Sequence, residues 1–270
     1  MTPRTPARRA TSAVGAVMLL AVASGCAAAG AESTSTLRAP HLIKAGVLTA
    51  CSDMPYAPFE WKKNGRAAGF DIDLVRKVAE NLHLRLVVKD TDFEAIQSGD
   101  ALNSDQCDVA ISAMTITGER AQVLDFSSPY FNASQALVVP KGTGYKSLAD
   151  LAGKKIGVQG GTTGELYVTD HAPTSAHVVP LTDANAMQAA MNSHAVDAVV
   201  YDNTVVGDVV ANDPSLQVSA QFDTGEQYGM AVKKNGNVDL LRSIDKLLAK
   251  LKADGGYGKI YAKWFGGTKH

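Results

Sequence analysis

Two side chains of opposite charge stand where an α/β protein could use them to hold a small ligand. Arg120 could bind a carboxylate, because its planar guanidinium offers paired N–H donors and stays charged when removed from water. It follows an expected strand that ends at Ser112, at the edge where α/β sheets bind ligands. Asp202 follows an apolar segment that ends at Tyr201, and its carboxylate could receive an ammonium group. Two alternatives remain open: Arg120 as a surface residue in the first turn of a helix, and Asp202 as the cap of the helix that follows it.

A glycine-rich segment could bind an anion. Residues 159–164 read Gln-Gly-Gly-Thr-Thr-Gly and lie between an expected strand and an expected helix. Glycines at such a place let main-chain N–H groups approach an anion at the N-terminus of the helix. The segment has neither the Gly-Lys-Ser/Thr of a P-loop nor the G-x-G-x-x-G of a dinucleotide site, so a nucleotide is disfavoured. The alternative is an ordinary turn between a strand and a helix.

The composition and the lack of other motifs exclude several classes of function. The 270 residues are 46% hydrophobic and 20% charged, which is ordinary for a globular protein of one large or two modest domains. A net charge of −1 without a basic stripe argues against a nucleic-acid partner. The sequence has no G-x-S-x-G and no H-E-x-x-H, and its six histidines lack the spacing of metal ligands. We therefore expect no enzyme activity, no metal site and no cofactor.

The first 41 residues have the pattern of an export signal followed by a tether. Arginines precede the apolar run 13–23, whose eleven residues are too few for a bilayer that needs about 20. We expect a signal peptide over residues 1–25. Cys26 ends an Ala-Ser-Gly-Cys sequence that resembles the lipobox of bacterial lipoproteins, so it is the expected lipidation site, and residues 26–41 are the expected lipid-anchor tether. Simple cleavage near the same place is the alternative.

The other two cysteines form an even pair if Cys26 carries lipid. In an oxidising compartment Cys51 and Cys107 could form a disulfide. The alternative is two buried thiols that act as small hydrophobic side chains. Sequence alone does not fix their separation in space, so both structures stay open.

Strands alternate with helices along the rest of the chain, which predicts parallel sheets with helices on their faces. The alternation repeats after Pro140 and ends with two helices, and so predicts two α/β lobes. Expected strands are 47–52, 85–89, 108–112, 155–158, 176–179, 196–200 and 228–232. Expected helices are 72–82, 163–169, 183–192, 240–251 and 257–265.

Several motifs in order point to one family. Residues 69–74 read Gly-Phe-Asp-Ile-Asp-Leu, and with Val78 and Ala79 they resemble the signature of the polar amino acid family (family 3) of bacterial extracellular solute-binding proteins. Further segments agree at residues 53–60, 112–120, 125–130, 228–231 and 261–266. The resemblance covers residues 42–266. Within this family the chain is similar to glutamine-binding and lysine/arginine/ornithine-binding proteins.

The resemblance implies the two-lobed α/β fold of periplasmic binding proteins. Each lobe would be a mainly parallel sheet flanked by helices, and two crossing strands would form a hinge. Residues 42–130 and 230–270, which include the C-terminal helices, would build the first lobe, and residues 131–229 would build the hinge and the second lobe. The crossings would lie near residues 131–137 and 227–230.

The resemblance also implies a ligand site between the lobes. The main chain of Ala113 and the side chain of Thr115 would hold the head group of an amino acid beside Arg120, and Asp202 would receive its ammonium. Further implied contacts are Thr162 and Thr163 on the ligand carboxylate and Gln159 on its side chain.

Three residues are expected around the side chain of that ligand. Tyr56 and Phe93 match the two aromatics that sandwich its aliphatic part, although aromatics at such positions can also be core residues. Asp53 would lie at the far end of the pocket. There its carboxylate could accept hydrogen bonds from an amide or a cation, and it would repel an acidic side chain.

The implied function is that of the substrate-binding lipoprotein of an amino acid ABC importer. It would capture a polar or basic L-amino acid by hinge closure, with glutamine favoured, and deliver it to the permease and its ATPase. We expect an exported monomer, anchored by lipid on the outer face of the cytoplasmic membrane. The alternatives are an enzyme of the same fold, similar to cyclohexadienyl dehydratase, and an amino acid sensor.

Overall fold

The computed structural model describes residues 39–266, which belong to one compact unit, Leu37–His270. The expected signal peptide, Cys26 and most of the expected tether lie outside the described residues. Within the described range, no helix is both long enough and apolar enough to cross a membrane.

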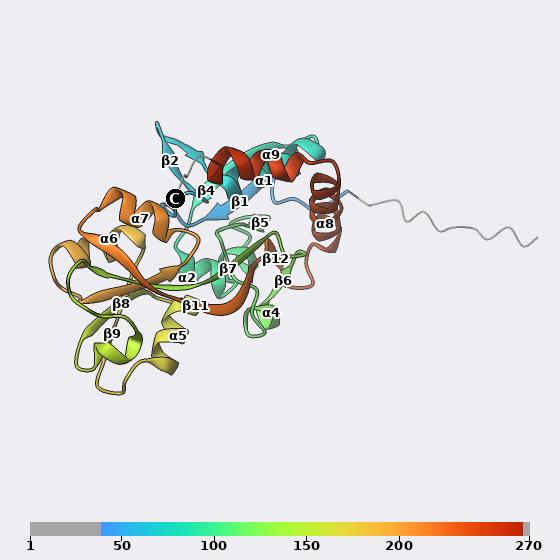
Figure 1. Ribbon diagram of the computed structural model, residues 1–270. Helices are drawn as coiled ribbons and strands as arrows, with labels where there is room; N and C mark the ends of the chain where they lie inside the picture. The colour runs from blue at the N-terminus through green and yellow to red at the C-terminus, as the bar shows by residue number, and fades with distance from the viewer. Residues whose placement is uncertain (1–38, 267–270) are drawn as a thin grey trace, which may run out of the picture. The chain divides into compact units, whose positions relative to one another are not determined.

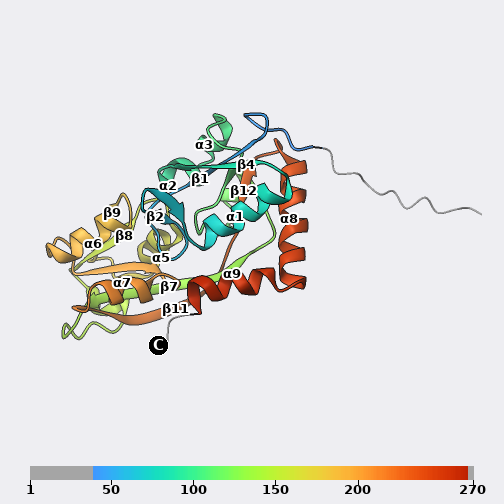
Figure 2. The same ribbon diagram turned by 90° about the horizontal axis from the view of Figure 1, so that it is seen from above.

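The first of two five-stranded sheets has the strand order β4-β1-β5-β12-β6 (Figure 1). Strands β4, β1 and β5 are parallel, and β12 is antiparallel to both of its neighbours. Helices α1 and α8 cover one face of this sheet, and α2 and α3 lie on the other (Figure 2). The strands are β1 (Val47–Ser52), β4 (Arg85–Asp90), β5 (Val109–Ala110), β6 (Leu124–Phe126) and β12 (Ala231–Lys233). The helices are α1 (Phe70–Asn81), α2 (Phe93–Gln97), α3 (Asp100–Asn103), α4 (Arg120–Val123), α8 (Val238–Ala253) and α9 (Gly256–Phe265), and a hairpin of β2 (Trp61–Lys63) and β3 (Arg66–Ala68) precedes α1.

The second sheet has the order β11-β7-β10-β8-β9. Strands β10, β8 and β9 are parallel, whereas β7 and β11 run antiparallel at one edge. The strands are β7 (Phe131–Pro140), β8 (Lys155–Gln159), β9 (His177–Leu181), β10 (Ala198–Asp202) and β11 (Leu216–Tyr228). The helices are α5 (Thr163–His171), α6 (Ala184–Asn192), α7 (Val206–Asn212) and the 3₁₀ turn η1 (Leu148–Leu151). Two α/β lobes are therefore present, as expected.

Strands β7 and β11 lie side by side where the chain passes between the two sheets (Figure 1). Phe131 pairs with Tyr228 at the start of the crossing, and the register shifts between Phe222 and Glu226. Aromatic rings pack at this point: the ring of Phe59 lies 5.0 Å from that of Phe131 and 5.4 Å from that of Tyr228. The crossing thus begins in a packed aromatic cluster, which favours one fixed path for both strands.

The structure departs from the expected elements in two respects. The expected strand 228–232 is divided, because β11 ends at Tyr228 in the second sheet and β12 begins at Ala231 in the first. Most of β11 was not expected as a strand, although Leu216, Val218, Ala220 and Phe222 alternate with polar residues in the way that indicates one. The sheets themselves are mainly parallel, as expected: in each, four strands run the same way and one opposes them, β12 in the first sheet and β7 in the second.

Candidate functional site

A cavity lies between the two lobes and is lined by residues from both. The space between its walls that is not filled by atoms is about 490 Å³, counting its open mouth. All ten residues expected at the ligand site line it: Asp53, Tyr56, Phe93, Ala113, Thr115, Arg120, Gln159, Thr162, Thr163 and Asp202. The first six come from segments of the first lobe and the other four from the second.

Arg120 is a buried cation at the start of α4. Its guanidinium donates from Nη1 to the carbonyl of Thr115 at 2.8 Å and from Nη2 to the carbonyl of Gly161 at 2.9 Å, and it lies 5.2 Å from the centre of the Phe93 ring. Burial lowers the pKa of Arg120 to about 10, while the nearby charges of Asp202 and Glu226 oppose the shift, so the group stays charged at neutral pH. In the described part of the chain it has no carboxylate at ion-pair distance. Arg120 is therefore not a surface residue, and its charge is left for an anion.

Asp202 supplies the opposite charge at the end of β10. Its carboxylate accepts hydrogen bonds from Gln135 Nε2 at 2.7 Å and from the hydroxyl of Tyr228. Burial and the neighbouring Glu226 raise the pKa of Asp202 to about 6. Val205 is the residue that precedes α7 as its cap, so the capping alternative for Asp202 does not hold.

The hydroxyls of Thr115 and Thr163 meet at a third residue that the sequence did not indicate. Each donates to Oε2 of Glu226 at 2.7 Å, and Gln135 Nε2 donates to Oε1 at 2.9 Å. Burial raises the pKa of Glu226, but the hydrogen bonds from Thr163, Thr115 and Gln135 outweigh it and hold the pKa below its ordinary value. Glu226 lies on the crossing strand β11. Its ionised carboxylate therefore joins Thr115 of the first lobe to Thr163 of the second.

The glycine-rich segment lies between β8 and α5, as expected. Thr162 caps α5: its hydroxyl accepts from the Glu165 N–H at 3.2 Å and donates to the Gln159 carbonyl at 2.8 Å. Gly161 has φ of +73°, and a Cβ there would lie 2.2 Å from Oε2 of Glu94. Because the Thr162 hydroxyl is engaged in the cap, the groups that this segment can offer an anion are the first N–H groups of α5.

Ala113 offers less of its main chain than expected. Its N–H donates to Oδ2 of Asp71 at 2.7 Å, so the carbonyl is the main-chain group left for a ligand. The backbone of Ala113 has φ of +42°, which is uncommon for a residue other than glycine.

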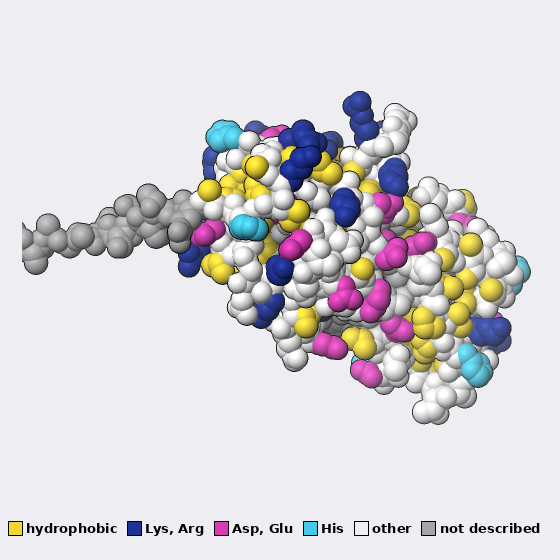
Figure 3. All heavy atoms as spheres, turned by 180° about the vertical axis from the view of Figure 1, so that it is seen from behind, with side chains coloured by type: hydrophobic (Ala, Val, Ile, Leu, Met, Phe, Trp, Pro, Cys, Tyr) yellow, Lys and Arg dark blue, Asp and Glu magenta, His cyan; other side chains and the backbone are white. Residues whose placement is uncertain are grey.

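The far end of the cavity is acidic. Asp53 Oδ2 accepts a hydrogen bond from Gln159 Nε2 at 2.7 Å, across the two lobes. Burial, together with the charges of Asp183, Asp90 and Asp92, raises the pKa of Asp53 to about 6, although the hydrogen bond from Gln159 opposes the shift. On the face drawn in Figure 3, acidic side chains gather across the middle with few basic ones among them.

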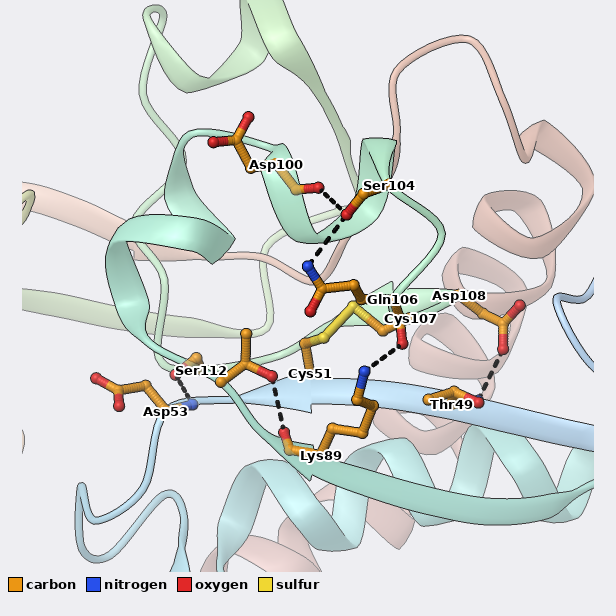
Figure 4. Close-up of a disulfide and its surroundings, with 11 residues drawn as sticks. Thr49, Cys51, Asp53, Lys89, Asp100, Ser104, Gln106, Cys107, Asp108 and Ser112 are labelled. Atoms are coloured by element: carbon orange, nitrogen blue, oxygen red, sulfur yellow. Dashed lines mark hydrogen bonds between the residues drawn. A yellow bond between two sulfur atoms is a disulfide. The ribbon is translucent and has the colours of Figure 1, made fainter.

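A disulfide joins Cys51 to Cys107 near Asp53, which lines this end of the cavity (Figure 4). Both residues are buried, at the end of β1 and just before β5. The hydrogen bond from the Asp53 N–H to the Ser112 hydroxyl, 3.0 Å long, links the same two segments one step closer to the cavity (Figure 4). The disulfide therefore lies behind the segments that carry Asp53 and Ala113.

The fold and the charged cavity between the lobes define the class: a two-lobed solute-binding protein with the periplasmic-binding-protein fold. The chain belongs to the family of bacterial extracellular solute-binding proteins, family 3, whose sequence model matches residues 48–267. It is 34% identical over 216 residues to the ABC transporter arginine-binding protein 1 of Escherichia coli (strain K12), with 78% of this chain and 87% of that protein covered.

Two solved structures are also similar to this chain. One is described as an ancestral arginine-binding protein bound to arginine, with 43% identity, a TM-score of 0.77, and coverage of 82% of this chain and 98% of that one. The other is described as an ancestral arginine-binding protein bound to glutamine, with 43% identity, a TM-score of 0.78, and coverage of 83% and 99%. The resemblance seen in the sequence motifs is thus confirmed at the level of family and fold.

Proposed function

We propose that this protein is the substrate-binding component of an amino acid ABC importer. The observation that supports it most is the pair of opposite charges in one buried cavity, Arg120 and Asp202. An α-amino acid carries one carboxylate and one ammonium, and these two side chains can bind them as charge-assisted hydrogen bonds. The N–H groups at the start of α5 add donors on the carboxylate side.

Binding occurs by closure of the two lobes. Contacts such as Arg120 to Gly161 and Asp53 to Gln159 join the lobes across the cavity and exist only when the lobes approach each other. A ligand that touches both lobes gains contacts only in this arrangement, so it shifts the population toward it. The permease recognises the closed form.

We propose a cationic amino acid such as arginine as the preferred ligand, ahead of glutamine. The sequence favoured glutamine because Asp53 and Gln159 can both serve an amide. The charges of Asp90, Asp92 and Asp183 around Asp53 add negative potential at the same end, which attracts a cation more than a neutral amide. Similar proteins are named for arginine, and the ancestral relative holds either arginine or glutamine in its structures.

A thermal-shift screen of the standard amino acids tests this function. A ligand present at 100 times its dissociation constant adds about 2.7 kcal/mol to stability, and arginine is expected to give the largest shift. Calorimetry then measures the affinity, and analysis of the mixture checks that the ligand is unchanged. If no amino acid raises the melting temperature, the proposal is wrong, and turnover of a bound acid would support the enzyme alternative.

We further propose that the protein is exported as a monomer and held at the outer face of the cytoplasmic membrane by lipid on Cys26. The family of extracellular solute-binding proteins supports export. The small residues before Cys26 support lipidation.

A further inference from the structure

Two carboxyl side chains, Glu60 and Asp71, are buried together behind the cavity wall of the first lobe. Both have no solvent exposure. Their segments meet at Gly69, where a Cβ would lie 1.9 Å from the carbonyl oxygen of Phe59, and the Asp71 N–H donates to that same carbonyl at 3.0 Å. Only glycine permits this approach, which places the two acids side by side.

One oxygen of each carboxyl holds part of the cavity wall. Glu60 Oε1 accepts from the Ser112 hydroxyl at 2.9 Å. Asp71 Oδ2 accepts from the Ala113 N–H and from the Tyr130 hydroxyl, both at 2.7 Å. The pair therefore fixes two successive residues of the wall and the tyrosine that precedes the crossing strand β7.

The second oxygen of each carboxyl lacks such a donor among the residues that the structure describes. Glu60 Oε2 and Asp71 Oδ1 are buried, and no N–H or O–H of the described residues donates to them. The charge of Asp71 nevertheless raises the pKa of Glu60, so the two carboxyl groups lie close enough to affect each other. An ionised carboxylate can only accept, so a hydrogen bond between two of them requires one proton.

The surroundings oppose two negative charges here. The titratable groups that face the pair are Asp53, Tyr56, Tyr130 and Tyr257, and none of them is a cation. Neither carboxyl takes part in an ion pair within the described range. Burial raises the pKa of Asp71 to about 7, and burial together with the Asp71 charge raises the pKa of Glu60.

We propose that Glu60 and Asp71 share one proton in the folded protein, and that this singly protonated pair positions the Ser112–Ala113 wall of the ligand cavity. The hydrogen bond to Asp71 holds Ala113 at its positive φ. The Ser112 hydroxyl, which donates to Glu60, also accepts from the Asp53 N–H and so fixes that residue. The pair touches no ligand and acts through these residues. The positioning role rests on the proposed function, whereas the shared proton does not.

Three variants test the shared proton without a ligand. In Glu60→Gln or Asp71→Asn the new amide can donate to the remaining carboxylate, so each protein should fold. In the double variant two amide donors face each other, and it should be much less stable than either single variant. If both single variants fail to fold, or if the double variant is as stable as they are, the proposal is overturned.

Infrared difference spectra of the ligand-free protein supply the direct measurement. At neutral pH the wild type should show the carbonyl absorption of a protonated carboxylic acid, and each single variant should lose all of that absorption, because one proton serves both groups. The matched control is Asp108→Asn, a buried acid of the same lobe that accepts from the Ile43 and Thr49 N–H groups and should leave the absorption unchanged. Absence of the absorption in the wild type would overturn the proposal.

A pH series gives a second readout. The folded pair keeps its proton above the ordinary carboxyl pKa. The contribution of this pair to stability is therefore greatest below about pH 4 and declines as the pH rises toward 7, with up to about a ten-fold change in the folding equilibrium constant per pH unit. The wild type should lose stability over this range more steeply than Asp71→Asn. Equal slopes would contradict the shared proton.

Ligand affinity tests the positioning role separately. Asp71→Ala leaves the Ala113 N–H without its acceptor and should weaken amino acid binding about ten-fold or more, whereas Asp71→Asn should restore most of it. If the wild type binds no amino acid, the proposed function fails while the spectra still decide on the proton. If Asp71→Ala binds as tightly as the wild type, the positioning role is wrong.

Discussion

The Asp53 carboxylate and the Gln159 amide form a hydrogen bond of 2.7 Å that joins the two lobes at the far end of the cavity. An acid at this place should select against acidic ligands. We expect the wild type to bind arginine, lysine and glutamine at least about ten-fold more tightly than glutamate, because like charges in a desolvated site cost several kcal/mol. Asp53→Asn should narrow that difference, as measured by calorimetric titration. The exposed Asp100→Asn is the control for a general change of charge, and tighter binding of glutamate by the wild type would contradict the role of Asp53.

The pH dependence of binding should differ between ligands. Burial raises the pKa of Asp53 to about 6, so the carboxyl becomes neutral as the pH falls below that value. Affinity for arginine should then fall by up to about ten-fold per pH unit, and affinity for glutamine should fall less. The pKa of Asp202, also raised to about 6 by burial, affects both ligands through their common ammonium. Equal pH profiles for arginine and glutamine would show that Asp53 does not contact the ligand side chain.

Arg120→Ala should abolish useful binding while leaving the protein folded. Truncating one partner of a buried charge pair costs about 2–5 kcal/mol, or about 30-fold to several thousand-fold in affinity. Arg120→Lys keeps the charge but not the paired donors, and should recover only part of the affinity. Calorimetry with circular dichroism as the folding check decides this, and wild-type affinity in a folded Arg120→Ala protein would remove Arg120 from the site.

Glu226→Gln should loosen the contact between the lobes when no ligand is bound. The carboxylate accepts from the hydroxyls of Thr115 and Thr163. The amide of glutamine carries no charge and has one acceptor oxygen instead of two, so it holds these hydroxyls more weakly. We expect a larger radius of gyration by small-angle scattering, restored when arginine is added. The exposed Glu119→Gln is the control. An unchanged radius in ligand-free Glu226→Gln would mean that this carboxylate does not hold the lobes together.

Loss of the disulfide should destabilise the first lobe. Cys51 and Cys107 are separated by 56 positions. Closing a loop of that length lowers the entropy of the unfolded chain, which stabilises the folded protein by at most about 4 kcal/mol. Replacing both cysteines with alanine should lower the free energy of unfolding in urea by up to this amount. An unchanged free energy of unfolding without the disulfide would show that the packing around these two positions stabilises the lobe by itself.

Cys26→Ser should release the protein from the membrane fraction into the periplasm or medium. Removing the acyl chains removes the membrane affinity that they provide. Fractionation followed by detection of the protein measures this directly. Unchanged retention at the membrane would argue against lipid on Cys26.

The positions of Arg120 and Asp202 could be predicted from sequence because each follows a strand, and strand ends meet at one edge of a sheet. Glu226 and Gln135 could not, since their importance comes from partners that are distant in the chain, such as Thr115, which is 111 positions from Glu226. Gln135 did leave a signal, as it is a buried polar residue in the otherwise largely apolar strand β7. The strand β11 left one also, in its alternation of apolar and polar residues.

Strand β12 lies between β5 and β6 in the first sheet, although it comes from a part of the chain more than 100 residues later. The first lobe therefore cannot complete its sheet until residues 231–233 have left the ribosome, whereas the second lobe is continuous in the chain from β7 to β11. During synthesis the N-terminal segment stays unfinished for longest. The first lobe of such a chain would remain unfolded, and therefore accessible to an export machinery that handles unfolded polypeptides, until residues 231–233 are made.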